Sequence, residues 1–272
     1  MSLADRIDTT KVQALLREAA ETIVLPRFDS LRGHEIIEKA PGDLVTVADL
    51  EAERFLTREL RALLAGSLVV GEEAHSKDPE ILRRFEDDGP VWVIDPVDGT
   101  KNFTKSSATF CMMVALVERN RPIMGWIHDP LPNRTAIAVD GAGGWLDGQR
   151  LTIPEAPPEK DMIGLVNAWY FEEPRRKQVR AEAQARFGHV SSLSCAGQDF
   201  LAQAQGKRHF SFYRRLWPWD HAPGALLLRE AGGMVERVDG TPYRAGDRVH
   251  GLLSAPSAKI WRDLRQFLMS RD

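Results

Sequence analysis

The sequence is organised around one ten-residue stretch beginning at residue 91, which reads VWVIDPVDGT. Its first four residues are apolar and predict a short buried strand bounded by turn signals. The strand is expected to end on Asp95, because Pro96 has no backbone N–H to continue regular pairing. A second carboxylate, Asp98, follows two residues after Pro96, and Gly99 then permits a tight turn. The stretch therefore predicts two acidic side chains at the end of a buried strand.

Two carboxylates this close together repel each other unless a cation lies between them. Oxygen ligands without a neighbouring Cys or His suit Mg²⁺ better than Zn²⁺. An ordinary Asp-Gly turn after a strand is the alternative interpretation. Such a turn needs only one acid, so the whole stretch favours a metal-binding function over a simple turn.

Other segments support this interpretation and lead to a family resemblance. They are Gly42–Thr46 with Asp49, Gly71–Glu73, Gly141–Gly148, Trp219-Asp220 and Glu230–Gly233. In this order, and together with VWVIDPVDGT, they closely resemble the inositol monophosphatase family, which are Mg²⁺-dependent, lithium-sensitive phosphomonoesterases. The resemblance covers most of the chain, and the combination is far more specific than any single motif.

The resemblance implies an α/β fold class with a layered α/β/α/β/α arrangement of the sugar-phosphatase type. A mixed sheet is expected in the first half and an α/β unit in the second. Strand-like segments at 109–118, 123–128 and 134–139, joined by short turns, predict antiparallel pairing. Three prolines in Pro154–Lys160 predict a stiff connector. We therefore expect a metal-binding α+β domain at 1–153 and an α/β domain at 154–272 that supplies Asp220 and substrate contacts.

The resemblance also implies a metal site built from both halves. One Mg²⁺ would be held by Glu72, Asp95 and the carbonyl of Val97. A second would be held by Asp95, Asp98 and Asp220, and a third, weaker ion would lie near Glu72. Asp220 must then come from the second half of the chain, which places the site at the junction of the two halves. The expected cofactor is therefore two to three Mg²⁺ ions.

The implied catalytic residues are Glu72, Thr100 and Asp49. Glu72 and Thr100 would activate the attacking water, and Asp49 would orient the hydroxyl of Thr100. The pattern Thr46-x-x-Asp49 also resembles a helix capping box, and both roles of Asp49 can hold at once. Glu73, beside Glu72, is expected to be an exposed charge or an indirect contact.

Contacts to the substrate are also implied by the resemblance. The expected residues are Asp98, Gly99, Thr100, Ser194, Cys195, Ala196 and Asp220. One of these assignments has a simpler alternative, because Asp220 could cap a helix for which Pro223 suits the first turn. The neighbouring His221 is not assigned to the site and is expected at the surface or behind the site.

The identity of the substrate is left open by the sequence. Inositol 1-phosphate, histidinol phosphate, a sugar bisphosphate and a 3′-phosphoadenosine nucleotide are all compatible with the superfamily. In the family, an acid shortly before the Trp-Asp pair contacts the inositol hydroxyls, but Phe210–Trp219 contains no Asp or Glu. It contains Arg214 and Arg215, which can only donate hydrogen bonds and suit an anion.

These arginines suggest that an anionic or aromatic ester is a better substrate than inositol 1-phosphate. Phe212, Tyr213 and Trp217 could pack against a ring. The alternative is that the arginines face solvent and the aromatic side chains belong to the core.

The composition limits the classes of partner. The 272 residues carry a net charge of −3, which gives no reason to expect a nucleic-acid surface. No apolar run approaches the roughly 18 residues of a membrane span, and the first ten residues do not resemble a signal peptide. Cys111 and Cys195 predict reduced thiols and a cytoplasmic location. The resemblance implies a homodimer acting on a small phosphorylated substrate. A non-catalytic regulatory protein of the same fold is the rival of a different class.

Overall fold

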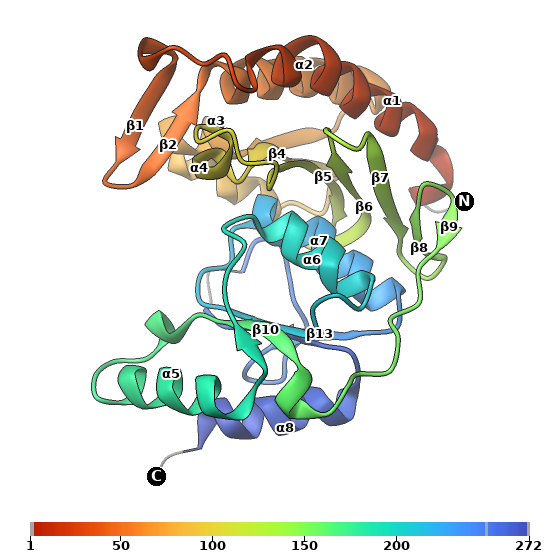
Figure 1. The fold of residues 1–272 in the computed structure, drawn as a ribbon. Helices are drawn as coiled ribbons and strands as arrows, with labels where there is room; N and C mark the ends of the chain where they lie inside the picture. Colours follow the sequence, from red (N-terminus) through yellow and green to blue (C-terminus); the bar gives the residue numbers. More distant parts are fainter. Residues whose placement is uncertain (1–2, 248–249, 271–272) are drawn as a thin grey trace.

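The computed structural model describes residues 3–247 and 250–270, which form five stacked layers (Figure 1). A pair of helices, a seven-stranded sheet, a second pair of helices, a five-stranded sheet and a last pair of helices follow one another through the molecule. This is the layered α/β/α/β/α arrangement that the resemblance implies, so the predicted fold class is confirmed.

The larger sheet lies entirely in the first half of the chain. Its strands, in spatial order, are β3 (Leu68–Gly71), β4 (Val91–Asp98), β5 (Cys111–Glu118), β6 (Arg121–Asp129), β7 (Arg134–Val139), β8 (Gly143–Leu146) and β9 (Gln149–Arg150). β3 and β4 are parallel, and every later pair is antiparallel. The sheet is therefore mixed, and the antiparallel pairing expected for residues 109–139 is confirmed. β4 is buried along its whole length, which explains its unbroken apolar start.

One face of this sheet is covered by α1 (Thr9–Ala19) and α2 (Val47–Leu63), and α1 continues into a π-helical turn at Ala20–Val24. The apolar stripes of both helices face Trp92 and Trp126, whose ring centroids are 6.0 Å apart within this core. A hairpin of β1 (Ile36–Ala40) and β2 (Asp43–Thr46) leads into α2.

The other face is covered by α6 (Ala196–Ala204) and α7 (Pro218–Glu230), which come from the second half of the chain (Figure 1). Val93 and Met113 of the sheet share one hydrophobic cluster with Phe200 of α6 and Leu226 of α7. The core of the first half is thus completed by helices of the second. The division into domains at residue 153 remains a prediction.

The smaller sheet closes the second half. In spatial order its strands are β11 (His189–Val190), β10 (Ile163–Val166), β12 (Phe210–Tyr213), β14 (Leu252–Ala255) and β13 (Met234–Arg237). Its outer face is covered by α5 (Arg175–Arg186) and α8 (Ala258–Met269), which pack on it through a third hydrophobic cluster. β13 and β14 are antiparallel, whereas β10 pairs in parallel with β11 and β12.

One expectation about the first half is wrong in detail, because the central strand does not end at Asp95 but continues to Asp98. Between β3 and β4, a 3₁₀ helix at Pro79–Phe85 buries Ile81 and Phe85 against the larger sheet. Within the described residues, no helix is both long and apolar enough to cross a membrane.

The contact between α7 and the larger sheet requires a glycine at position 125. A Cβ placed there would lie 2.9 Å from Cα and 3.1 Å from the carbonyl oxygen of Pro223. Both are backbone atoms, so the helix itself would have to move. We predict that Gly125→Ala lowers the free energy of unfolding by about 1–3 kcal/mol, as overpacked cores do.

This prediction is checked by urea titration, with Gly89→Ala as the matched control because a Cβ at position 89 meets no atom within 4 Å. Equal midpoints for wild type and Gly125→Ala would show that the helix and the sheet are not in this close contact.

Candidate active site

The two central carboxylates lie on one side of β4 because the strand contains a bulge. Asp98 lies three positions after Asp95, which would place the two side chains on opposite faces of a regular strand. Asp95 pairs with Met113 and Asp98 pairs with Cys111, so β4 has one residue more than β5 across this step. The extra residue returns Asp98 to the face of Asp95. Pro96 lies in the bulge, where its missing N–H breaks no regular ladder.

The turn after β4 positions Thr100. Gly99 has a φ of +90°, a left-handed conformation that favours glycine, and a Cβ there would lie 2.9 Å from the carbonyl oxygen of Thr109. Thr100 then opens the short helix α4 (Thr100–Phe103). Its Oγ1 lies 3.0 Å from the carbonyl oxygen of Val97 and 3.2 Å from Oδ1 of Asp49. The hydroxyl has one proton, so it donates to one of these oxygens and can accept from a third group.

Asp49 is fixed by the start of α2. Its Oδ2 accepts from the backbone N–H of Thr46 at 2.9 Å and from the Thr46 hydroxyl, and Thr46 in turn caps the N–H of Ala48. The predicted capping box is therefore confirmed. Burial raises the pKa of Asp49 to about 7, although hydrogen bonds from Thr46 and Thr100 oppose the increase.

The other acidic segment, Glu72-Glu73, begins helix α3 (Glu72–Lys77). The backbone N–H groups of Glu73 and Ala74 each donate at 2.8 Å to the carboxylate of Glu53, a buried residue of α2. Glu53 thus satisfies the open end of α3 and holds it against α2. Sequence analysis missed Glu53; its only signal is a charge within the apolar stripe of α2.

Lys39 of the β1–β2 hairpin reaches both acids. Its Nζ lies 3.3 Å from Glu72 and 3.0 Å from Glu73. Burial works against the charged ammonium, but the two carboxylates outweigh it and raise the pKa of Lys39. Glu73 is buried in this ion pair, so the expectation that it is an exposed charge is wrong. Lys39 was not identified from the sequence.

Asp220 approaches from the second half on the first turn of α7. This helix begins at Pro218 with Trp217 as its N-cap residue, and the cap has no side-chain hydrogen bond. Asp220 is therefore not the cap, and Pro223 lies inside the helix rather than in the first turn expected for it. His221 is buried with its Nδ1 2.9 Å from the carbonyl oxygen of Trp217, so a surface position is excluded.

The start of α6 contacts Asp98 directly. Oδ2 of Asp98 accepts from the backbone N–H of Gly197 at 2.6 Å and from the thiol of Cys195 at 3.1 Å. Cys111 lies on the other side, with its Sγ 3.7 Å from that of Cys195. The N–H of Gly197 is therefore occupied by Asp98 rather than open to a ligand. The contacts expected for Ser194, Cys195 and Ala196 with a substrate remain predictions.

The combined field of these acids disfavours their ionisation. Burial raises the pKa of Asp95 well above its ordinary value, and repulsion from Glu72, Asp98 and Asp220 adds to the effect. Burial also raises the pKa of Glu72, Asp98 and Asp220. At Asp220, repulsion from Asp98 adds to the effect of burial on the pKa. Oδ1 of Asp95 is buried and has no hydrogen-bond partner among the described residues.

These observations fit a divalent cation. Four carboxylates converge, and one buried oxygen of Asp95 lacks a partner among the described residues. The thiols of Cys195 and Cys111 lie beside Asp98, but burial raises the pKa of both and so disfavours the thiolates that would bind a metal. A hard cation with oxygen ligands, such as Mg²⁺, would relieve both the repulsion and the missing contact. The residues that could hold it are Glu72, Asp95, Asp98, Asp220 and the Val97 carbonyl.

A cavity of about 590 Å³ opens onto this cluster, and we call it the acidic cavity. Glu72 and Asp220 line it from the two halves, with Lys39 and Asp43 from the hairpin. Arg215 and Trp217 form part of its wall. The volume lies in the range of small-molecule sites. The structure thus brings the predicted metal ligands together at the junction of the halves, beside an opening that can admit a small substrate.

Comparisons with known proteins agree with this arrangement. The model of the inositol monophosphatase family matches residues 5–267. An inositol-1-monophosphatase of Bacillus subtilis is 29% identical over 230 residues, covering 84% of each chain. A fructose-1,6-bisphosphatase/inositol-1-monophosphatase of Thermotoga maritima is 30% identical over 211 residues, covering 77% of this chain and 78% of the relative. The solved inositol monophosphatase II of Staphylococcus aureus has a TM-score of 0.80 and 23% identity, covering 98% of this chain and 96% of its own.

The raised carboxyl pKa values predict how Mg²⁺ stabilises the protein at different pH. A carboxyl with a raised pKa favours the ion-free fold below its ordinary pKa of about 4, and this contribution disappears as pH rises through the raised value. Mg²⁺ binds the ionised acids, so its stabilising effect grows over the same rise. We expect the increase in melting temperature on replacing EDTA with Mg²⁺ to be larger at about pH 8 than at about pH 5.5.

Calorimetric melting with EDTA and with Mg²⁺ at both pH values measures this difference. The same increase at both pH values, or none at either, would argue against ligation by the acidic cluster.

Proposed function

This chain belongs to the inositol monophosphatase family, and we propose that it hydrolyses a small phosphate monoester of the inositol-1-phosphate type in a Mg²⁺-dependent reaction. The observation that carries the proposal is the convergence of Glu72, Asp95, Asp98 and Asp220 around a buried oxygen that lacks a partner. Two Mg²⁺ ions would be held by these four acids and the Val97 carbonyl. When bound, they would stabilise the negative charge on the phosphoryl group during its transfer and lower the pKa of the attacking water.

The residues of the chain then have distinct tasks. Glu72 faces the acidic cavity and would accept the proton of the attacking water. Thr100 would orient that water, because its single hydroxyl proton is directed to the oxygens of Val97 or Asp49 and its lone pairs remain able to accept. Asp49, fixed by the capping box, would hold the Thr100 hydroxyl in place.

Asp220 would lie beside the leaving oxygen, on the side of the cavity formed by the second half. The oxygen of water would bond to phosphorus as the ester P–O bond breaks. The leaving oxygen would take up a proton from solvent, while Glu72 holds the proton lost by the attacking water.

We expect direct attack by water and no phosphorylated enzyme intermediate. The two thiols nearest the acids are poor nucleophiles, because burial raises the pKa of Cys111 to about 12 and that of Cys195 well above its ordinary value. Neither cysteine lines the acidic cavity.

Lys39 bears on the number of ions. Its ammonium already contacts Glu72 at the place where a third, weaker ion is expected. A third ion would therefore compete with Lys39 and be held more weakly than the first two. The homodimer and the cytoplasmic location remain predictions of the sequence and the resemblance.

Two observations favour a second substrate specificity. The Thermotoga relative is named for a bisphosphate as well as for inositol 1-phosphate, and two arginines precede Trp217 in this chain where the family's substrate acid would lie. Hydrolysis of a sugar bisphosphate, histidinol phosphate or a 3′-phosphoadenosine nucleotide is the alternative. A phosphate-release screen over these esters with Mg²⁺ tests the proposed class and ranks its members. Absence of release from every ester would favour the regulatory, non-catalytic interpretation.

We predict that Asp98→Asn nearly abolishes turnover while the protein stays folded. The amide keeps an oxygen for the N–H of Gly197 but removes one negative charge from the metal site. Loss of an indirect contact to a metal ligand typically costs tenfold to a hundredfold, so loss of a ligand charge should reduce kcat by about a hundredfold or more.

Asp95→Asn provides an independent variant, because Oδ1 of Asp95 has no hydrogen-bond partner to lose in the part of the chain that the structure describes. Asp263→Asn on α8, which removes only an exposed pair with Lys259, is the control. Wild-type rates of phosphate release in folded Asp98→Asn and Asp95→Asn would contradict the assignment.

We also predict that LiCl inhibits and that excess Mg²⁺ slows turnover. Both effects follow from the family resemblance, in which a weakly held ion must leave before product is released. Steady-state titration with LiCl, with KCl at equal ionic strength as control, measures the first effect. Equal rates in the two salts would count against a weakly held ion.

A further inference from the structure

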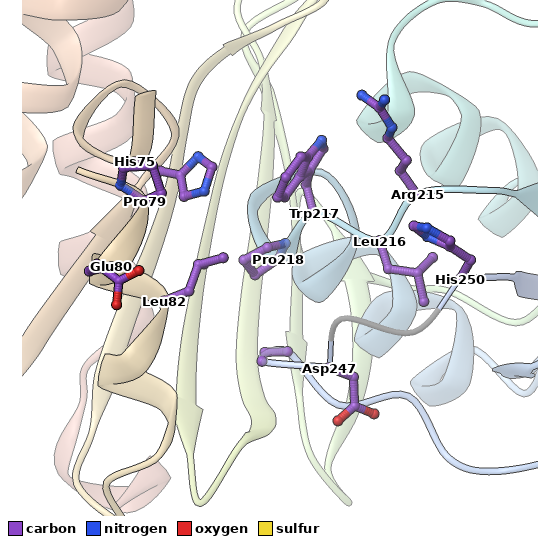
Figure 2. Close-up of a pocket in the computed structure, with 12 residues that line it drawn as sticks. His75, Pro79, Glu80, Leu82, Arg215, Leu216, Trp217, Pro218, Asp247 and His250 are labelled. Atoms are coloured by element: carbon purple, nitrogen blue, oxygen red, sulfur yellow. The ribbon is translucent and has the colours of Figure 1, made fainter. Parts of the chain in front are cut away.

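The acidic cavity does not end at the metal ligands. A second cavity of about 490 Å³, which we call the outer cavity, shares His75, Pro79, Arg215 and Trp217 with it. In Figure 2, His75 and Leu82 stand on one side of the outer cavity and face Trp217 and Pro218 on the other. The two cavities are therefore neighbouring parts of one recess. A phosphoryl group near Asp220 leaves the rest of its molecule to extend past Trp217.

The wall between the two parts is aromatic. The rings of Trp217 and Trp219 are stacked with centroids 5.2 Å apart and planes 7° apart. The imidazole of His75 packs against both, at 5.1 and 5.0 Å. Trp219 is buried and Trp217 is partly exposed, so Trp217 presents the outer surface of this stack to a ligand. Such a surface favours a planar ring.

Of the described charged side chains that line the outer cavity, Arg215 alone lacks an ionic partner. Glu80 and Asp247 line the outer cavity, but Glu80 is paired with Arg83 at 2.7 Å and Asp247 with Arg237 at 2.8 Å. Arg215 is exposed and makes no hydrogen bond, ion pair or ring contact with any described residue. Its guanidinium is thus the charge that a ligand can neutralise, and guanidinium binds phosphate or carboxylate with two parallel hydrogen bonds.

The structure distinguishes the roles of Arg215 and Arg214, which the sequence alone could not distinguish. Arg215 lines the acidic cavity, the outer cavity and a third cavity that contains Asn167, Trp169 and Asp220. Of these three cavities, Arg214 lines the third and neither of the others. A second anionic group on a substrate that reaches Asp220 from any of these directions meets Arg215.

We propose that Arg215 and Trp217 form a subsite that selects phosphate monoesters with an aromatic ring and a second anionic group, as in a nucleoside bisphosphate. The ring lies against Trp217 and the second anion binds Arg215, while the phosphate to be cleaved lies at the acidic cluster. This inference rests on the proposed phosphatase function for the cleavage step but not for binding.

Two matched pairs of esters separate the contributions. Adenosine 2′-monophosphate and adenosine 2′,5′-bisphosphate differ by one phosphate, as do fructose 1-phosphate and fructose 1,6-bisphosphate. Inositol 1-phosphate is the reference. We expect the second phosphate to raise kcat/KM by about tenfold to a hundredfold, beyond the statistical factor of two cleavable groups, as charge-assisted hydrogen bonds allow. The adenosine bisphosphate is expected to rank first.

Two variants test the named residues. Arg215→Gln should remove most of the gain from the second phosphate in both pairs. Trp217→Leu should lower kcat/KM by about tenfold for the adenosine esters and less for the fructose esters, in line with the worth of base stacking. Arg262→Gln on α8 removes an equal charge far from the recess and should leave the gain unchanged. Arg214→Gln should reduce the gain less than Arg215→Gln does.

Calorimetric binding of adenosine 2′,5′-bisphosphate to wild type and Arg215→Gln in EDTA separates the two levels of the proposal. Weaker binding to Arg215→Gln without hydrolysis of any ester would support the subsite and refute the phosphatase function. Hydrolysis of all esters with no gain from the second phosphate, inositol 1-phosphate ranking first and equal binding to both proteins would refute the subsite and leave the phosphatase function standing.

Discussion

The structure depends on an electrostatic conflict at the place where its two halves meet. Glu72, Asp95, Asp98 and Asp220 come from three separate elements and converge in an environment that raises the pKa of each. The chain itself relieves only part of the repulsion. Lys39 contacts Glu72, and the N–H of Gly197 contacts Asp98, but one oxygen of Asp95 has no partner among the described residues. A cluster this costly to bury makes sense when a divalent cation completes it.

The acids are held in place by other buried polar groups rather than by packing alone. Glu53 binds the backbone N–H groups that open α3 and so fixes the direction from which Glu72 approaches. Asp49 binds both Thr46 and Thr100, joining the start of α2 to the turn after β4. Rigid supporting contacts of this kind limit how far ligands must move when a cation binds, which is what a preorganised site requires.

The sequence predicts structural features that depend on residues close together in the chain, and it does not predict contacts between residues far apart in the chain. The buried strand at residue 91, the capping box at Thr46 and the family's acidic segments have local signatures, so the layered fold and the convergence of the metal ligands could be anticipated. The contacts of Lys39 with Glu72 and of Glu53 with Glu73 join residues 33 and 20 positions apart. No local pattern marks either partner. The bulge that realigns Asp98 with Asp95 likewise appears only when β4 is paired with β5.

The acids proposed to bind the cation and the residues proposed to select the substrate differ in how much a substitution would disturb the structure. Asp49 and Asp98 are buried and hydrogen-bonded to other elements, so a side chain of different shape there disturbs the core as well as the proposed reaction. Arg215 is exposed and Trp217 partly so, in the connection between β12 and α7, where a new side chain displaces little. Because this connection immediately precedes Asp220, Arg215 and Trp217 lie directly beside the proposed reacting centre. A substitution at either residue would change the proposed substrate contacts while the acidic cluster keeps its structure.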